Sequence, residues 1–183
     1  MELLEILRNE VKPALGCTGP ISVAFATAAA KDAVGGTPKS IRVLMDRDTY
    51  KNSIAVVTPG TSFTGVLEPS VVGAFYGESK LGMEVLANMK NPDEDFIRKF
   101  AKEHASVEII WEYKGMGVLI EAYVETENGT GHVIVANAHD RIVLLEANGK
   151  VLQKDKSYDP NDIAFEKKGP IRDYGVKDFY EFA

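Results

Sequence analysis

The sequence predicts an α+β fold in which amino-terminal helices pack on a mainly antiparallel sheet. Up to residue 104 the apolar residues recur mainly at helical spacing, whereas from Ser106 onward they recur at every second position. Asn-Gly pairs, the preferred two-residue hairpin connection, separate predicted strands in the second half. Helices that precede a run of strands are typical of the α+β class.

Five segments of the first half are predicted to be helical. Apolar residues from Leu3 to Val11 recur at helical spacing between charged ones, and Pro13 ends this first helix. The second helix begins near Pro20, because proline suits a first turn, and its alanine-rich run ends before Gly35-Gly36. The other predicted helices are Pro69 to Tyr76, Lys80 to Met89 and Pro92 to His104.

Strands are predicted from the content and spacing of apolar residues. One strand, Ser40 to Asp46, interrupts the helices and leads into a polar loop at Asp46 to Asn52. An antiparallel meander follows later, with strands at Val107 to Tyr113, Val118 to Glu127, Thr130 to Ala138 and Arg141 to Ala147. After an extended connection from Lys154 to Pro170, Val176 to Ala183 predicts two helical turns that stop without a cap, as in a chain cut from a longer protein.

Composition and charge narrow the class of protein. The 183 residues are 45% hydrophobic, which suits a single domain, and their 21 basic and 27 acidic residues are mixed along the chain, so no nucleic-acid surface is expected. The longest apolar stretch, Ile21 to Ala30, is too short to span a bilayer, and no membrane partner is expected. A single cysteine and the lack of a secretory signal favour a reducing cytoplasm.

Cys17 is the most informative single residue. It lies in Gly16-Cys17-Thr18-Gly19-Pro20, directly before the second predicted helix, where free N–H groups and the helix dipole stabilise an anion. A thiolate favoured in this way could be a nucleophile or a metal ligand. The alternative is a small buried apolar side chain, the usual role of a lone cysteine. Thr18 either caps the helix or binds a substrate hydroxyl.

Two further features are candidates for a binding site. A polar loop could offer N–H groups to a carboxylate or phosphate, but it matches no phosphate-loop signature, and the residues by themselves favour an ordinary turn. Its residues are Asn52, Thr58, Gly60, Thr61 and Gly65. The second feature is His139, which closes a predicted strand where a general base or ligand can be presented, or serves as a turn residue.

The remaining titratable residues form no catalytic or metal motif of their own. His104 falls on a charged helix, where a solvated side chain is expected, and His132 lies in the middle of a predicted strand. One cysteine and three scattered histidines lack the spacing of a zinc or cluster site. Catalysis by this chain alone is therefore not expected.

The run Glu10-Val11-Lys12-Pro13-Ala14-Leu15-Gly16-Cys17-Thr18-Gly19-Pro20-Ile21-Ser22-Val23-Ala24 closely resembles the opening motif of the L-cysteine desulfidase family, which is related to the iron–sulfur L-serine dehydratases. Three more stretches are similar in the same order, so the resemblance spans almost the whole chain. They are Tyr50-Lys51-Asn52 with Ser53, Thr58-Pro59-Gly60-Thr61, and Gly131-His132-Val133 leading to His139 before Ile142-Val143.

The resemblance implies a lyase of amino-acid catabolism that eliminates water or sulfide from L-serine or L-cysteine to give pyruvate and ammonia. In such enzymes an open iron site of a [4Fe-4S] cluster acts as a Lewis acid. Cys17 matches the motif cysteine taken to be a cluster ligand, and the other ligands belong to a carboxy-terminal domain or subunit. This chain, residues 1–183, would be the amino-terminal part and is not expected to bind the cluster alone.

The resemblance also assigns expected roles to pocket residues. His139 and Thr18 are the candidate catalytic residues, and the candidate substrate-binding residues are Asn52, Pro59, Gly60 and Thr61. The implied fold is that of the dehydratase beta domain, which is similar to the allosteric substrate-binding domain of some phosphoglycerate dehydrogenases.

The chain departs from the family pattern at one position beside the cysteine. The family usually has glutamate where this chain has Gly19, so a carboxylate is missing next to Cys17. Two hypotheses follow: a lyase half that is completed by a partner, and a non-catalytic domain that senses a small amino or hydroxy acid. The sequence leaves open whether the chain forms a homo-oligomer.

Overall fold

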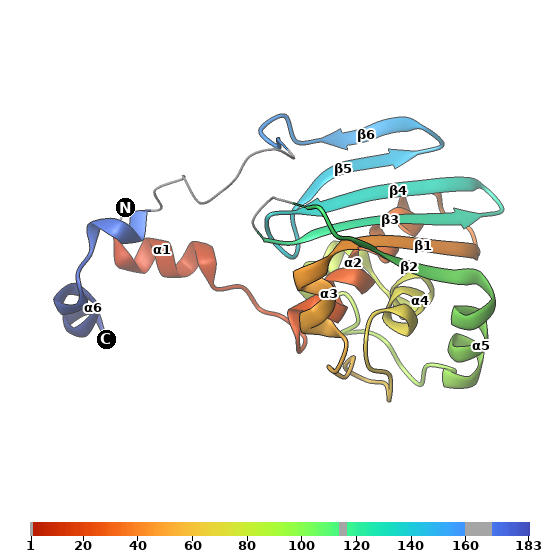
Figure 1. Cartoon of the computed structure of the whole chain (residues 1–183), viewed down its shortest axis with the longest axis horizontal. Helices are drawn as coiled ribbons and strands as arrows, with labels where there is room; N and C mark the ends of the chain where they lie inside the picture. The colour runs from red at the N-terminus through yellow and green to blue at the C-terminus, as the bar shows by residue number, and fades with distance from the viewer. Residues whose placement is uncertain (1, 114–116, 160–169) are drawn as a thin grey trace.

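A computed structural model of the chain describes residues 2–113, 117–159 and 170–183 and contains a six-stranded sheet with α2 to α5 against one of its faces (Figure 1). The strands are β1 (Pro38–Asp46), β2 (Ala105–Ile110), β3 (Leu119–Thr126), β4 (Gly129–Ala136), β5 (Ile142–Ala147) and β6 (Lys150–Lys154). The helices are α1 (Leu3–Glu10), α2 (Thr18–Val34), α3 (Arg47–Ser53), α4 (Leu67–Tyr76), α5 (Glu94–His104) and α6 (Val176–Phe182), with 3-10 helices η1 (Ser79–Glu84) and η3 (Pro170–Asp173).

The strand order joins both halves of the chain in one sheet. From edge to edge the order is β2-β1-β3-β4-β5-β6. β1 and β2 are parallel, and the other neighbouring strands are antiparallel. In the β5–β6 connection Asn148 and Gly149 have φ values of 54° and 75°. Two successive positive φ values are the signature of a type I′ turn, which Asn-Gly favours.

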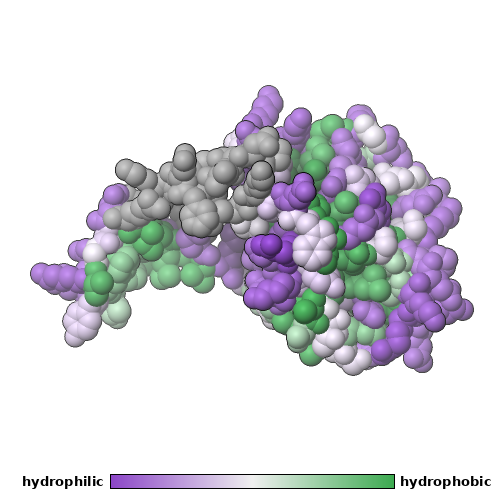
Figure 2. Space-filling view, viewed as in Figure 1, coloured by the Kyte–Doolittle hydropathy of each residue, from purple (hydrophilic) through white to green (hydrophobic). Residues whose placement is uncertain are grey.

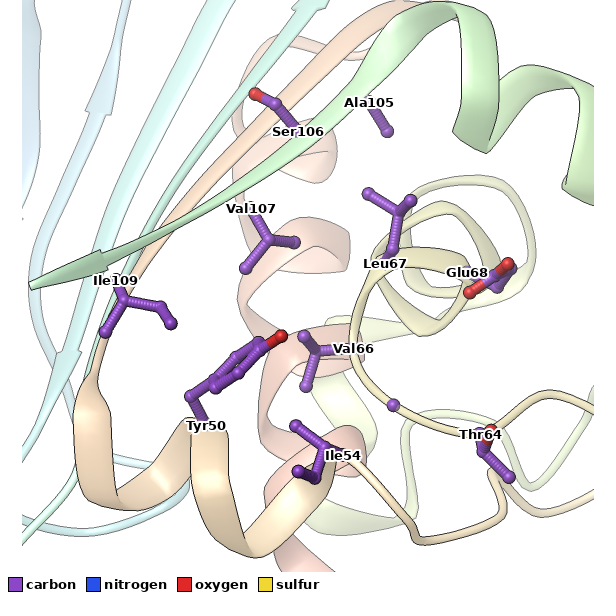
Figure 3. A pocket seen from close by; sticks show the side chains of 11 residues that line it. Tyr50, Ile54, Thr64, Val66, Leu67, Glu68, Ala105, Ser106, Val107 and Ile109 are labelled. Atoms are coloured by element: carbon purple, nitrogen blue, oxygen red, sulfur yellow. The ribbon is translucent and has the colours of Figure 1, made fainter.

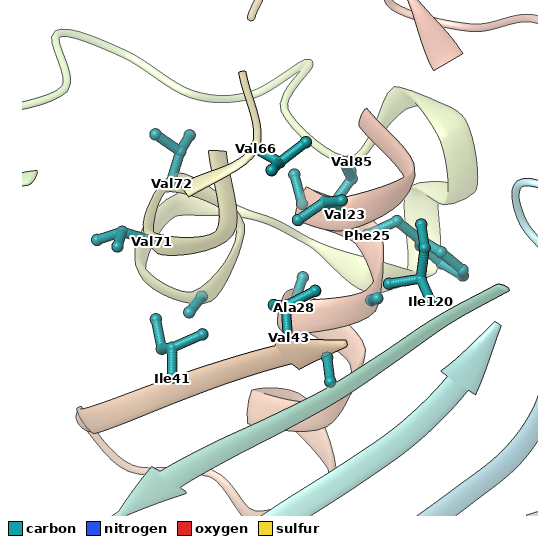
Figure 4. Packing of buried hydrophobic residues seen from close by; sticks show 14 of the residues in the cluster. Val23, Phe25, Ala28, Ile41, Val43, Val66, Val71, Val72, Val85 and Ile120 are labelled. Carbon is teal, nitrogen blue, oxygen red and sulfur yellow. The ribbon is translucent and has the colours of Figure 1, made fainter. Parts of the chain in front are cut away.

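The α2 helix forms the centre of the hydrophobic core. It is buried from Gly19 to Ala30 and packs against α4 and the inner face of the sheet, where Val43 and Ile120 point toward it (Figure 4). Glycine permits this close approach, because a Cβ atom on Gly73 of α4 would lie only 2.2 Å from the carbonyl oxygen of Ala24. The core therefore holds α2 in a fixed position, and at its amino end Thr18 and the preceding Cys17 are exposed.

The predicted α+β fold class is confirmed, and so are most of the predicted elements. One predicted strand pairs with a different neighbour, and in a different direction, from those expected. β2 was expected to open an antiparallel meander, but it pairs in parallel with β1, from Ile41 opposite Ala105 to Asp46 opposite Ile110. Parallel neighbours need a long crossover, and α3, α4 and α5 supply it. The prediction failed because hydrophobic period indicates a strand but not its neighbour.

Two predictions of local structure in the first half are wrong. The predicted loop from Asp46 to Asn52 is the helix α3, because the Asp46 carboxylate caps it by accepting the N–H groups of Asp48 and Thr49 at 3.0 and 2.8 Å. The predicted helix from Lys80 to Met89 is η1 followed by turns, since Gly82 adopts a φ of 57°. The predicted connection from Lys154 to Pro170 lies mostly outside the described residues.

The helices at the two ends of the chain lie apart from the sheet and its helices (Figure 1). α1 contacts η3, and this region presents hydrophobic surface (Figure 2). Leu7 and Val176, for example, are 47% and 85% exposed. In the described part of the chain, no helix combines the length and apolar character needed to cross a membrane.

Candidate functional site

The amino end of α2 presents Cys17 to solvent. Cys17 is the N-cap residue of this 17-residue helix, its thiol is free, and no side chain in the described segments caps the helix there. The N–H groups of Thr18 and Gly19 precede the first intrahelical hydrogen bond, so they add to the positive end of the helix dipole. The predicted setting for Cys17 is therefore present, and the buried apolar alternative is not.

The turn Thr58-Pro59-Gly60-Thr61 supports this end of α2. The Thr61 N–H donates to the Thr58 carbonyl oxygen at 3.2 Å, and Gly60 has a φ of 77°, as a type II turn requires after proline. Pro59 packs so closely on Gly16 that a Cβ atom there would lie 2.5 Å from the proline Cγ. Two predicted sites far apart in the sequence are thus in contact.

The loop between β4 and β5 brings His139 to the same end of α2. The Ser22 hydroxyl, one turn into α2, donates a hydrogen bond to the carbonyl oxygen of His139. Asn137 helps to set the loop with a φ of 68° and a hydrogen bond from its N–H to the Val118 carbonyl oxygen at 2.9 Å. The His139 side chain is half-buried beside α2 as a result.

Thr18 and His139 line one pocket of about 470 Å³. Its other lining residues come from the segment before α2, from η1 and from the β4–β5 loop, and they are Glu10, Lys12, Ala14, Met83, Asn137, Ala138 and Asp140. The Lys12 ammonium lies 2.9 Å from the Asp140 carboxylate, so a cation and an anion occur together in this pocket. An ionised amino acid carries the same pair of charges.

Burial makes His139 a candidate base. It lowers the pKa of this imidazole below its usual value, although the nearby carboxylates of Asp140 and Asp46 oppose the shift. Asp46 is itself buried and has three partners, since it also accepts the Leu119 N–H at 2.8 Å. A neutral imidazole can accept a proton from a substrate or bind a metal.

The predicted substrate-binding residues differ in their places. Pro59 touches the segment before Cys17, whereas Gly60 faces Met89, which a Cβ atom on the glycine would approach to 2.8 Å. The Thr61 hydroxyl bridges its own turn, donating to the Thr58 carbonyl oxygen at 2.9 Å and accepting the Phe63 N–H at 3.2 Å. Asn52 is exposed at the end of α3.

Gly19 packs directly against α3. A Cβ atom on Gly19 would lie 2.0 Å from the Ser53 hydroxyl oxygen and 3.2 Å from its Cβ. Ser53 is fully buried, and its hydroxyl donates to the Thr49 carbonyl oxygen at 2.7 Å. The glutamate that the resembling family usually has at this position therefore has no room in the present arrangement.

Three charged residues of this region were not predicted as part of the site. Asp46 ends β1, Lys12 precedes α2, and Asp140 follows His139. The signal for Asp46 was an aspartate at the end of a predicted strand, which is also an N-cap residue. Lys12 and Asp140 are 128 positions apart, and no local pattern indicates that they pair.

The donor set fits one thiolate ligand but not a whole cluster site. Among the described residues no group of three or more histidine, cysteine, aspartate or glutamate side chains could hold a metal ion. Cys17 is free and exposed at the amino end of α2, so its sulfur is accessible as a single ligand. The other ligands would have to come from elsewhere.

Comparison with known proteins gives relatives of greater length. The chain is 32% identical over 180 residues to a UPF0597 protein of Clostridium tetani, which covers 98% of this chain and 42% of that protein. A UPF0597 protein of Caldanaerobacter subterraneus is 33% identical with the same coverage. This chain is similar to UPF0597 proteins.

The similarity covers the chain but not the relatives. The chain spans about two fifths of the length of these UPF0597 proteins, whose names state no reaction, substrate or cofactor. No family model and no solved structure matches it.

Proposed function

We propose that this chain is the amino-terminal domain or subunit of an iron–sulfur lyase that eliminates water or sulfide from L-serine or L-cysteine. The observation that carries the proposal is that motif residues far apart in the sequence lie close together in space. Motif stretches that are separated by up to about 120 residues meet at the amino end of α2, with Cys17 exposed, Pro59 packed beside it, and Thr18 and His139 lining one pocket.

The residues of this pocket have chemistry that suits an amino-acid substrate. Lys12 can bind the α-carboxylate and Asp140 the α-ammonium, once a substrate replaces their mutual ion pair. The half-buried His139 can accept the α-proton as a neutral imidazole, because burial lowers its pKa. The Thr18 hydroxyl can orient the β-substituent at the dipole end of α2.

Cys17 would provide one ligand of a [4Fe-4S] cluster, whose open iron site supplies Lewis acidity toward the leaving group when the cluster is bound. The remaining ligands would come from a carboxy-terminal domain or subunit, and the Clostridium tetani UPF0597 protein is matched by this chain over only 42% of its length. A reducing cytoplasm suits such a cluster, and pyruvate and ammonia would be the products.

The test is to complete the chain and assay it without oxygen. The chain replaces the aligned two fifths of the Clostridium tetani UPF0597 protein, and the fusion is reconstituted with iron and sulfide. We expect pyruvate from L-serine or L-cysteine, loss of cluster iron in Cys17→Ser, and an intact cluster without turnover in His139→Gln. Lys150→Ala, at the far edge of the sheet, is the control. A folded fusion with no pyruvate, and cluster iron unchanged in Cys17→Ser, would refute the proposal.

A sensor of small amino or hydroxy acids is the second candidate, and one observation favours it. Gly19 packs on Ser53, so no carboxylate can stand beside Cys17 as it usually does in the resembling family. Calorimetry with L-serine and L-cysteine on the chain alone separates the two functions. Tight binding without a partner supports sensing, whereas no binding supports an incomplete active site.

A further inference from the structure

The two edges of the sheet differ in how they are protected. β6 forms one edge, is exposed along its whole length and carries Lys150 and Lys154. β2 forms the other edge with the sequence Ala-Ser-Val-Glu-Ile-Ile, which contains no lysine or proline. Lysines, other charged side chains and prolines are means by which proteins prevent an edge strand from pairing. Glu108 is the one charged residue of β2, and within the described residues nothing pairs with the outer side of this strand, so the edge is open.

An apolar groove of about 520 Å³ runs beneath this open edge (Figure 3). Alternate residues of β2 form its upper wall, with Val107 and Ile109 facing Tyr50 of α3 and Val66 at the start of α4. The side chains of Val107 and Ile109 are only partly buried. A strand added to β2 would place alternate side chains over this groove, as in other cases of strand addition.

The groups of β2 are self-complementary about Val107. In an antiparallel pair centred there, Val107 faces its own copy and Ala105 faces Ile109, so only apolar side chains meet on the groove side. On the opposite side of the sheet, Glu108 faces Ser106 of the second copy, and like charges are not placed opposite each other. Arg42 of the same chain holds Glu108 in a two-point ion pair with distances of 2.8 and 3.1 Å, which offsets its charge.

We propose that β2 pairs antiparallel with β2 of a second copy of this chain, centred on Val107, so that two six-stranded sheets become one continuous sheet and their apolar grooves close on each other. The occupant is a second copy because this one register places apolar side chains opposite each other on the groove side of β2 and keeps the two Glu108 side chains apart on the other side. The contact lies at a different place from the pocket at the amino end of α2, and the proposed lyase activity is not needed for it.

Sedimentation of the full chain tests the association. The chain is expected to sediment with the mass of two 20.0-kDa chains at micromolar concentration and to dissociate on dilution. Val107→Lys places two ammonium groups opposite each other and should raise the dissociation constant by about 100-fold or more. Val151→Lys, on the opposite edge strand, is the matched control and should leave it unchanged. Mixing Val107→Lys with Val107→Glu should restore association.

Disulfide trapping tests the register. In a Cys17→Ser background, which removes the one native cysteine, Val107→Cys should form a disulfide-linked dimer under mild oxidation, and Val151→Cys should not. Either of two results would overturn the proposal: a chain that stays monomeric at high micromolar concentration, or a dimer that Val107→Lys leaves intact. A β2 edge that pairs only with a different protein would appear as the first of these results.

Discussion

His132 and His139 differ in how carboxylates contact their imidazole rings. His132, in β4, has both ring nitrogens bound to carboxylates, at 2.7 Å from Glu146 and 2.8 Å from Glu121, and its ring stacks on Tyr123 with centroids 4.2 Å apart. His139, seven residues later, has no side-chain hydrogen-bond partner among the described residues and faces the pocket beside α2.

These surroundings shift the two pKa values in opposite directions. Burial alone lowers the pKa of His132, but its hydrogen bonds to Glu121 and Glu146 outweigh burial and raise the net value. For His139 burial dominates, so its pKa falls despite Asp140 and Asp46. Paired carboxylates thus favour the cationic form of the half-buried His132, whereas burial without such partners favours the neutral form of His139.

The largest expected effect comes from removing the paired histidine. His132→Ala leaves Glu121 and Glu146 without the cation that each contacts, so we expect a loss of about 2–3 kcal/mol in the free energy of unfolding. His139→Ala should cost less than about 1 kcal/mol, because its side chain makes no hydrogen bond that would be lost. Urea unfolding at pH 6 measures both. Equal losses in the two variants would contradict the comparison.

The second largest expected effect comes from adding a side chain at Gly19, where α2 packs on α3. Gly19→Glu must displace the buried Ser53 side chain, and we expect it to destabilise the chain by about 2 kcal/mol. The double variant Gly19→Glu with Ser53→Gly should recover at least about half of that loss in the same unfolding measurement. If Gly19→Glu alone is neutral, the α2–α3 contact is looser than the structure describes.

A third effect, smaller than loss of the His132 ring, is a pH dependence of opposite sign at the two sites. The pKa of His132 is raised in the folded state, so its contribution to stability is fully present below its unfolded value of about 6.5 and is lost as pH rises through the folded value. The pKa of His139 is lowered, so its contribution is present above the unfolded value and is lost as pH falls through the folded one.

Imidazole NMR resonances measure these pKa values directly. His132 should titrate above a model histidine peptide and His139 below it. Unfolding curves across the same pH range should lose their decline above about pH 6.5 in His132→Gln, while His104→Gln, an exposed side chain at the end of α5, serves as the control. A His139 resonance that titrates above the model peptide would remove the physical basis for its role as a base.

The sequence predicted most of the helices and strands, but not which of them pair. The period of apolar residues located α2 and β1 to β5 and missed the exposed edge strand β6, and Gly-Cys-Thr-Gly before a helix placed Cys17 at the amino end of α2. No local pattern could show that β2 pairs with β1, or that Lys12 pairs with Asp140 across 128 positions. Long-range pairing depends on how chain segments close in space, and the pattern within a segment does not contain that information.

His132 illustrates the same limit at the level of one side chain. In the sequence it was only a histidine in the middle of a strand, and its two carboxylate partners lie on β3 and β5. The register of the sheet creates this ion cluster, since His132 stands opposite Tyr123 on one side and Glu146 on the other. A predicted strand without its register would not reveal it.

The smallest expected effect is on the charged pair in the pocket. Lys12 is 55% exposed, so Lys12→Met should change the free energy of unfolding by about 0.5 kcal/mol or less, and high salt should remove even this difference. Asp140 would then lose a nearby cation, and the pKa of His139, measured by NMR, should rise because the carboxylate acts on the imidazole without competition. Arg42→Met, at the open edge of the sheet, is the control and should leave His139 unchanged while altering Glu108. A large loss of stability in Lys12→Met would mean that the pair holds the loop in place, and that it is not free to exchange for the charges of a substrate.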